Sequence, residues 1–136
     1  MTKDLVLLNL NEKWNCNLPF GWIPITGEKG IPNTEIYQSN HFTEHITNLP
    51  DILKDIYDII EVFEIQESGN MTFKKATECD FVYDGLEYIY TDKKFQFVIY
   101  CSHESSITVG GKELLEKIHE VWPDYVNRIW TFPFYT

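Results

Sequence analysis

The fold is decided by the stretch KFQFVIYCSHESSITVGG, residues 94–111. Its first half is rich in β-branched and aromatic residues and is apolar on both sides of an extended chain near its middle, which predicts a buried central strand. Strict alternation would place Phe95, Phe97, Ile99 and Cys101 on one side of that strand. The polar run SHESS then predicts a turn, ITV predicts a second short strand, and two glycines end that strand before a helix.

Two amphipathic helices are predicted, over residues 50–60 and 112–122, because their apolar residues recur at helical spacing. Between them, residues 71–109 alternate strand-like runs with turn signals, as an antiparallel meander does. Residues 61–67 fit either an extension of the first helix or a strand, and we favour the strand. We therefore predict an α+β fold in one domain, residues 1–136, with a single antiparallel sheet of four to six strands and both helices on one face.

The beginning of the chain gives weaker signals. Residues 4–14 fit either a short strand or a helix. Residues 15–33 are rich in Asn, Pro and Gly and predict a long irregular loop. A loop of this length in a small domain either binds something or is well packed, here through Trp14, Phe20 and Trp22. It is therefore a candidate functional loop.

The charge balance of the chain narrows the class of partner. There are 21 acidic and 11 basic residues, which gives a net charge of −10 at pH 7. Such a surface repels phosphate backbones, so nucleic acid is excluded as a partner class. It attracts a basic protein and accelerates encounter with it. The competing interpretation is that the charge serves solubility alone.

Cysteine usage and the N-terminal sequence indicate the compartment. Cys16, Cys79 and Cys101 are widely spaced and odd in number, which argues against a disulfide framework or a paired-cysteine zinc site. The short apolar run at residues 5–8 follows Asp4 and precedes no cleavage signal, so we expect neither a signal peptide nor a membrane span. We expect a cytoplasmic protein without a membrane partner.

A second feature is the acidic segment 51–67, which holds six carboxylates and one lysine. Acids three residues apart would form a ridge along one side of a helix. The functional interpretation is a docking surface for a basic protein, and the competing one is a solvated face. The predicted contact residues are Asp51, Asp55, Asp58, Glu61 and Glu64.

The turn after the central strand holds the residue types of a hydrolase. Ser102, His103 and Glu104 are adjacent in an extended chain, so their side chains alternate and cannot form one triad. The alternative function is a small hydrolase that uses His103 with Ser105 or Ser106 and a distant acid. The competing interpretation is that the hydroxyls satisfy backbone groups of the turn.

Two local motifs resemble ligand sites. His41, Glu44 and His45 match the H-x-x-E-H pattern, in which two histidines on a helix bind zinc and the glutamate acts as a base. The segment ends almost at once at Pro50 and no third ligand is evident, so we favour a pair of surface histidines. Residues 110–112, Gly-Gly-Lys, lack the spacing of a phosphate-binding loop and predict a plain strand-to-helix turn. We expect no metal and no cofactor.

Residues 97–111, followed by a helix that ends in Trp122-Pro123, resemble the C-terminal half of small acidic bacterial proteins, including some of the immunity type that partner polymorphic toxins. The resemblance implies a non-enzymatic protein that neutralises a basic toxin domain by masking its active site. Acidic residues would steer the encounter and exposed aromatic residues would anchor the complex. The resemblance carries neither a catalytic signature nor binding residues.

Overall fold

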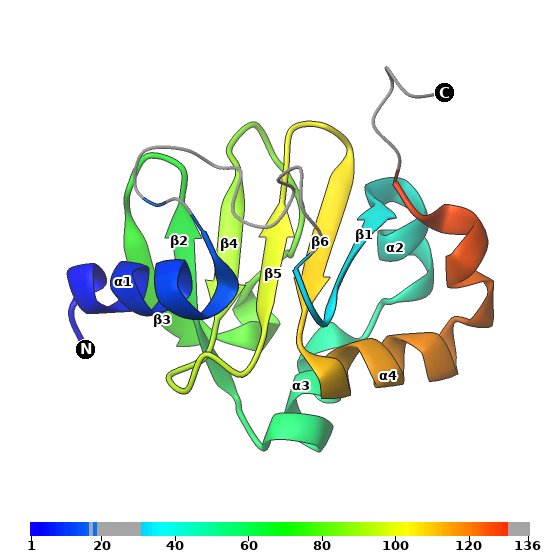
Figure 1. Ribbon diagram of the computed structural model, residues 1–136, viewed down its shortest axis with the longest axis horizontal. Coiled ribbons are helices and arrows are strands. Elements are labelled where there is room, and N and C mark those ends of the chain that lie inside the picture. The colour runs from blue at the N-terminus through cyan, green and yellow to red at the C-terminus, as the bar shows by residue number, and fades with distance from the viewer. Residues whose placement is uncertain (17, 19–30, 131–136) are drawn as a thin grey trace.

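The computed structural model describes residues 1–16, 18 and 31–130. One antiparallel sheet lies between helices on both of its faces, so the predicted α+β fold is confirmed (Figure 1). Most of the predicted functional loop, including Phe20 and Trp22, lies outside the described residues. The elements are α1 (Lys3–Trp14), β1 (Thr34–Gln38), α2 (Ser39–His45), α3 (Leu49–Tyr57), β2 (Glu61–Gln66), β3 (Met71–Lys75), the 3-10 turn η1 (Ala76–Glu78), β4 (Tyr88–Thr91), β5 (Val98–Cys101), β6 (Ser106–Gly110), α4 (Lys112–Val121) and the 3-10 segment η2 (Pro123–Arg128).

Within the described residues the sheet has six strands in the order β1-β6-β5-β4-β2-β3, and every neighbouring pair is antiparallel. β5 lies between β6 and β4, and all four of its residues are buried, which confirms the predicted central strand. The outer side of β1 is partly covered, because the N–H of Trp130 donates to the carbonyl of Ile36 at 2.9 Å. On the other side the sheet ends at β3, with no described strand beyond it.

The alternation predicted to begin at Phe95 begins two residues later. Phe95 has a φ of 55°, and its N–H donates to the carbonyl of Asp92 at 3.2 Å, so it belongs to the turn between β4 and β5. The buried carboxylate of Asp92 accepts the N–H of Gln96 at 2.7 Å and closes this turn. Phe95 consequently packs on the same face as Val98, opposite to the face that holds Phe97.

The two predicted helices, α3 and α4, pack on one face of the sheet, as expected, together with α2. Ile52 and Leu53 of α3 and Leu114 and Ile118 of α4 are at most 1% exposed and share a core with Ile99 of β5. Burial of this kind stabilises a fold by about 1.5–3 kcal/mol per large aliphatic side chain. This face holds the larger of the two cores.

α3 is shorter than the predicted helix 50–60. It ends at Tyr57, and Asp58 adopts the left-handed conformation, with a φ of 54°, that terminates many helices. The chain then enters β2 at Glu61, so the favoured interpretation of residues 61–67 as a strand is confirmed for all but the last residue.

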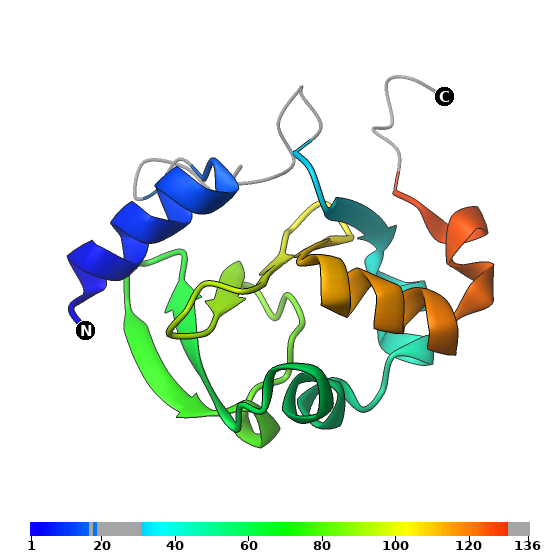
Figure 2. The ribbon, with the colours of Figure 1, turned by 60° about the horizontal axis from the view of Figure 1, so that its bottom comes forward.

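α1 covers the opposite face of the sheet (Figure 2). Leu10 and Trp14 of this helix pack in one cluster with Val98 of β5, and the indole N–H of Trp14 donates to the carbonyl of Phe95 at 3.1 Å. Gly110 permits this close approach, because a β-carbon there would lie 2.8 Å from the Trp14 ring. The second covered face explains why β5 is apolar on both sides. No helix in the described ranges is long and apolar enough to cross a membrane.

Candidate functional site

A buried glutamate holds an exposed histidine at one end of the sheet. Nδ1 of His103 donates to Oε2 of Glu87 at 2.5 Å, and the same oxygen accepts the backbone N–H of His103 at 2.9 Å. Glu87 is 4% exposed, whereas the side chain of His103 is 62% exposed. The imidazole is thus oriented through Nδ1, while no described residue hydrogen bonds to its Nε2.

Strand pairing brings these two side chains together. β4 pairs with β5 in a register that, continued one step beyond Tyr88 and Cys101, places Glu87 opposite Ser102, so the next residue along the chain, His103, lies within reach of the Glu87 carboxylate. The backbone of Glu87 is fixed from the opposite side, because its N–H donates to Oε1 of Glu67 at 2.8 Å and its carbonyl accepts the N–H of Glu67 at 2.9 Å. Three chain segments therefore meet at the pair.

The electrostatic surroundings favour the charged form of the imidazole. The hydrogen bond to Glu87 raises the pKa of His103 above its ordinary value of 6.5, and the charges of Glu87, Glu104 and Glu67 act in the same direction. Burial, and then the charge of Glu87, raises the pKa of Tyr100 and keeps its phenol neutral. His103 is consequently a group that can exchange a proton near physiological pH.

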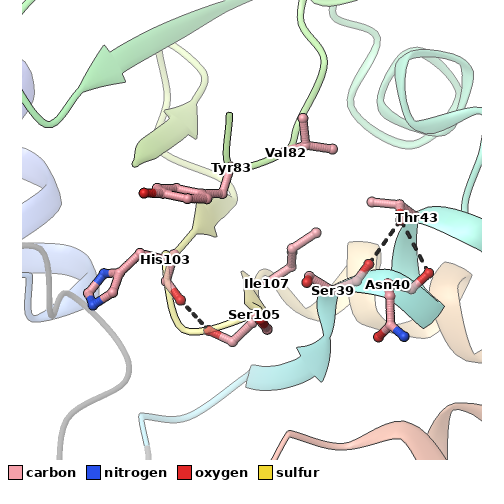
Figure 3. A pocket seen from close by; sticks show the side chains of 10 residues that line it. Ser39, Asn40, Thr43, Val82, Tyr83, His103, Ser105 and Ile107 are labelled. Atoms are coloured by element: carbon pink, nitrogen blue, oxygen red, sulfur yellow. Dashed lines mark hydrogen bonds between the residues drawn. The ribbon is translucent and has the colours of Figure 1, made fainter. Parts of the chain in front are cut away.

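A cavity of about 280 Å³, which we call the Tyr83–His103 hollow, opens beside this pair (Figure 3). Tyr83 and His103 stand on one side of it, and Ser39, Asn40 and Thr43 stand on the other. Most of its lining groups are hydroxyls, which can donate and accept hydrogen bonds. The lining residues are Ser39, Asn40, Thr43, Val82, Tyr83, Ser102, His103, Ser105, Ser106 and Ile107.

The predicted nucleophiles line the hollow but do not contact the imidazole. In Figure 3 the ring of His103 points away from Ser105, and no described serine hydrogen bonds to it. Ser106 is buried with its Oγ 2.7 Å from Oγ of Ser102, which also accepts the N–H of Glu104 at 3.0 Å. The Ser102 and Ser106 hydroxyls are thus engaged within the turn, and the exposed Glu104 is not the acid that holds the histidine.

The histidines of the H-x-x-E-H pattern both lie on α2, as predicted, but each has another partner. The ring of His45 stacks on Trp122, with centroids 5.3 Å apart, and its Nδ1 lies 2.9 Å from the carbonyl oxygen of His41. Nε2 of His41 lies 3.3 Å from the guanidinium of Arg128. Within the described part of the chain, no group of three or more His, Cys, Asp or Glu side chains is arranged to hold a metal ion.

The five predicted contact residues do not share one helical ridge, because α3 ends before Asp58 and β2 carries the last two. Asp51, Asp55 and Glu61 are exposed and make no ion pair with any described residue. Asp58 pairs with Lys54 in the next turn back along α3, and Glu64 pairs with Lys74 at 2.9 Å.

Further lysines surround this acidic surface. Lys93 and Lys94 line the same surface depression as Asp58 and Glu61, and Lys75 stands opposite Glu61 in the β2–β3 register. With Lys54 and Lys74, five ammonium groups therefore accompany the five predicted carboxylates. The buried Asp92 lines the same depression, so acids and lysines are mixed at this end of the sheet.

Comparison with protein-family models, curated proteins and solved structures finds no match to this chain. The function is accordingly argued from the residues and their geometry.

Glu87 is the functional candidate that the sequence pattern did not reveal. The predicted hydrolase required a distant acid, and Glu87 lies 16 residues before His103. In the sequence, Glu87 stands out as the single acid in the strand-like run LEYIYT, residues 86–91, where it occupies the second position. Glu87 reaches the histidine only because this run pairs antiparallel with residues 98–101 in the observed register.

Proposed function

We propose that this chain is a non-enzymatic protein that binds a basic protein partner. The observation that supports the proposal is the excess of ten negative charges, together with exposed carboxylates such as Asp51, Asp55 and Glu61 that have no ion-pair partner in the described ranges. Carboxylates that are not neutralised within the molecule attract an oppositely charged surface and increase the rate of productive encounter.

In its most specific form, the proposal is that the chain is a cytoplasmic immunity protein of a bacterium. It would bind a basic toxin domain and cover that domain's active site. The small size, the acidity and the resemblance of residues 97–111 to immunity-type proteins support this form of the proposal. Masking requires only a stable interface and no chemistry by the chain itself.

The test is affinity capture with the tagged chain in its source cell, followed by assay of each captured basic protein, with products of neighbouring genes included. We expect one basic protein to be toxic when expressed alone and harmless when the chain is expressed with it. The matched control is an unrelated acidic protein of equal charge, which should give no protection. Recovery of no protein that the chain inhibits would contradict the immunity form.

One observation favours a second candidate function, which is ester or amide hydrolysis. Glu87 orients His103 through Nδ1, as the acid of a catalytic triad does, and a hollow adjoins the pair. Because no serine contacts the ring, Nε2 would remove a proton from water as the water oxygen attacks the carbonyl carbon. The imidazolium would then return that proton to the leaving group as the bond to it breaks.

This second function is tested with p-nitrophenyl acetate. If it is correct, His103→Gln and Glu87→Gln should each lower the rate of ester cleavage by about 10²-fold or more, the typical contribution of a general base. Glu104→Gln is the control, since its exposed carboxylate does not hold the histidine, and it should retain the rate. Equal rates for all three variants and the unmodified chain would exclude His103 as a base.

A further inference from the structure

We propose that a second copy of this chain pairs with the outer edge of β3, so that the two sheets join antiparallel about a twofold axis at Phe73. The proposal goes beyond the binding function above, because it concerns a different surface and a different partner. β3 ends the sheet on this side, and its five residues are half-buried or exposed. An open strand edge presents unpaired backbone groups that can bond to another strand.

The register between β2 and β3 identifies the backbone groups that are available at this edge. The N–H of Ala76 donates to the carbonyl of Ile60 at 2.8 Å, so alternation along the strand directs the backbone groups of the even-numbered residues toward β2. The odd-numbered residues therefore point their N–H groups away from the sheet, and no described residue accepts a hydrogen bond from these groups. The outward residues are Met71, Phe73 and Lys75.

One register pairs these groups and keeps like charges apart. With Phe73 opposite Phe73 of the second copy, Met71 lies opposite Lys75 and Thr72 lies opposite Lys74, so the whole of β3 is paired. The two copies of Phe73 exchange backbone hydrogen bonds, and the N–H of Lys75 reaches the carbonyl of Met71 on both sides of the axis. A register centred on Lys74 or Lys75 would instead place identical ammonium groups directly opposite each other, which destabilises a sheet.

The lysines of β3 have counter-charges within their own chain. Lysine at an open edge commonly discourages pairing with another strand. Here Nζ of Lys74 lies 2.9 Å from Oε1 of Glu64, and Lys75 stands opposite Glu61 in the β2–β3 register. Each copy thus brings carboxylates to the joined edge together with its lysines, which reduces the repulsion between the two strands.

The side chain of Phe73 supplies an apolar contact at the centre of the joined edge. Its ring packs against Phe63, with centroids 4.8 Å apart, and Nζ of Lys93 lies 4.7 Å from its centroid, yet Phe73 remains 38% exposed. Pairing would place this ring beside the same ring of the second copy, and Phe63 and Phe73 of both copies would form one row across the two sheets. Aromatic pairs on neighbouring strands stabilise a sheet.

α1 contributes further exposed apolar side chains on the face of the sheet that carries Phe73. In Figures 1 and 2 its first turns extend beyond the edge of β3, and Leu5 and Leu8 are 44% and 52% exposed. Lys3 approaches the β2–β3 turn at Gly69, so the twofold axis would place the two copies of α1 at opposite ends of the joined edge. Each α1 would then overlie the edge of the other copy without colliding with its counterpart.

The first experiment measures self-association of the whole chain by sedimentation equilibrium, where we expect a reversible monomer–dimer equilibrium. Lys75→Pro should weaken the dimer by about tenfold, because it removes an N–H that the symmetric interface uses twice. The φ of Lys75 is −62°, which proline adopts, and its N–H does not bond to β2, so this variant should fold. The matched control, Lys75→Ala, loses the same side chain but keeps the N–H, and it should dimerise as the unmodified chain does.

The second experiment tests the register by disulfide cross-linking. Opposed residues that exchange hydrogen bonds in antiparallel strands have Cα atoms about 5.5 Å apart, which suits a disulfide. The double variant Met71→Cys/Lys75→Cys should form a covalent dimer in oxidising buffer. Met71→Cys and Lys75→Cys alone should not, because each new cysteine then faces a lysine or a methionine, and the native cysteines Cys16, Cys79 and Cys101 are buried.

Three results would overturn the proposal. Sedimentation as a monomer at millimolar concentration would show that β3 does not pair with a second copy, and the capture of a basic partner would remain a separate question. Equal dimerisation of Lys75→Pro and Lys75→Ala, with both variants folded by circular dichroism, would show that the dimer uses another surface. Efficient cross-linking of either single-cysteine variant would exclude the register centred on Phe73.

Discussion

At the scale of single residues, Glu87 determines the behaviour of His103. A buried carboxylate is costly unless donors satisfy it, and His103 supplies two of them, the backbone N–H and the Nδ1–H. The histidine in return acquires a fixed ring orientation and a raised pKa. The sequence alone could identify His103 as a notable residue but not Glu87, because their proximity depends on the register of two strands.

We expect Glu87→Gln to lower the pKa of His103 toward its ordinary value of 6.5, because the hydrogen bond to a carboxylate is the main cause of the upward shift. A raised pKa in the folded protein favours folding at pH values below 6.5, and this contribution is lost as pH rises through the folded-state pKa. The variant should lack that pH dependence. NMR titration of the imidazole ring measures the pKa, and urea unfolding at several pH values measures the linkage.

Glu104→Gln is the matched comparison for this titration. Glu104 raises the pKa of His103 through its charge alone, from an exposed position, so its removal should produce a smaller decrease. Equal decreases in the two variants would show that the hydrogen bond to Glu87 is not the main cause.

At the scale of elements, the strands were easier to predict than the N-terminal helix. The run FVIYC is β-branched and aromatic throughout, and such a run is typical of a strand covered on both faces. The segment that becomes α1 gave no clear period, because Leu5 and Leu8 are exposed while Val6, Leu7 and Leu10 are buried. Its position on the second face depends on Trp14 and Gly110, which are far apart in the sequence.

We expect Leu10→Ala to lower the free energy of unfolding by about 2–5 kcal/mol, since it removes a fully buried side chain from the contact between α1 and the sheet. Leu8→Ala changes the same residue type on the same helix, but Leu8 is 52% exposed, so its effect should stay within about 0.5 kcal/mol. Urea unfolding followed by circular dichroism measures both. Similar effects of the two substitutions would contradict the docking of α1 on the second face.

At the scale of the whole molecule, the fold brings lysines beside part of the acidic excess that gives the chain its net charge of −10. The acidic segment 51–67 was the prominent feature of the sequence, yet the lysines of the turn before β5 and of β3 lie beside it in the fold. The segments around the hollow show no comparable run of acids in the sequence.

Association with a basic partner should slow markedly as salt rises, because long-range attraction between the two charged surfaces accelerates their encounter. The Debye length falls from about 30 Å at 0.01 M salt to about 8 Å at 0.15 M, so most of this attraction is screened at the higher concentration. Stopped-flow measurements at the two concentrations give the association and dissociation rate constants separately. The dissociation rate should change less, and an association rate that is independent of salt would contradict electrostatic steering.

The coverage of β1 by Ile129 and Trp130 leaves the sheet with unequal edges, since no described strand lies beyond β3. If two copies of the chain paired through β3, the joined sheet would end at a β1 on each side, and both of these strands are partly capped. Association of two copies through their β3 edges would therefore stop at a dimer. Open-ended stacking of sheets, the route by which exposed edges form fibres, requires two available edges per molecule.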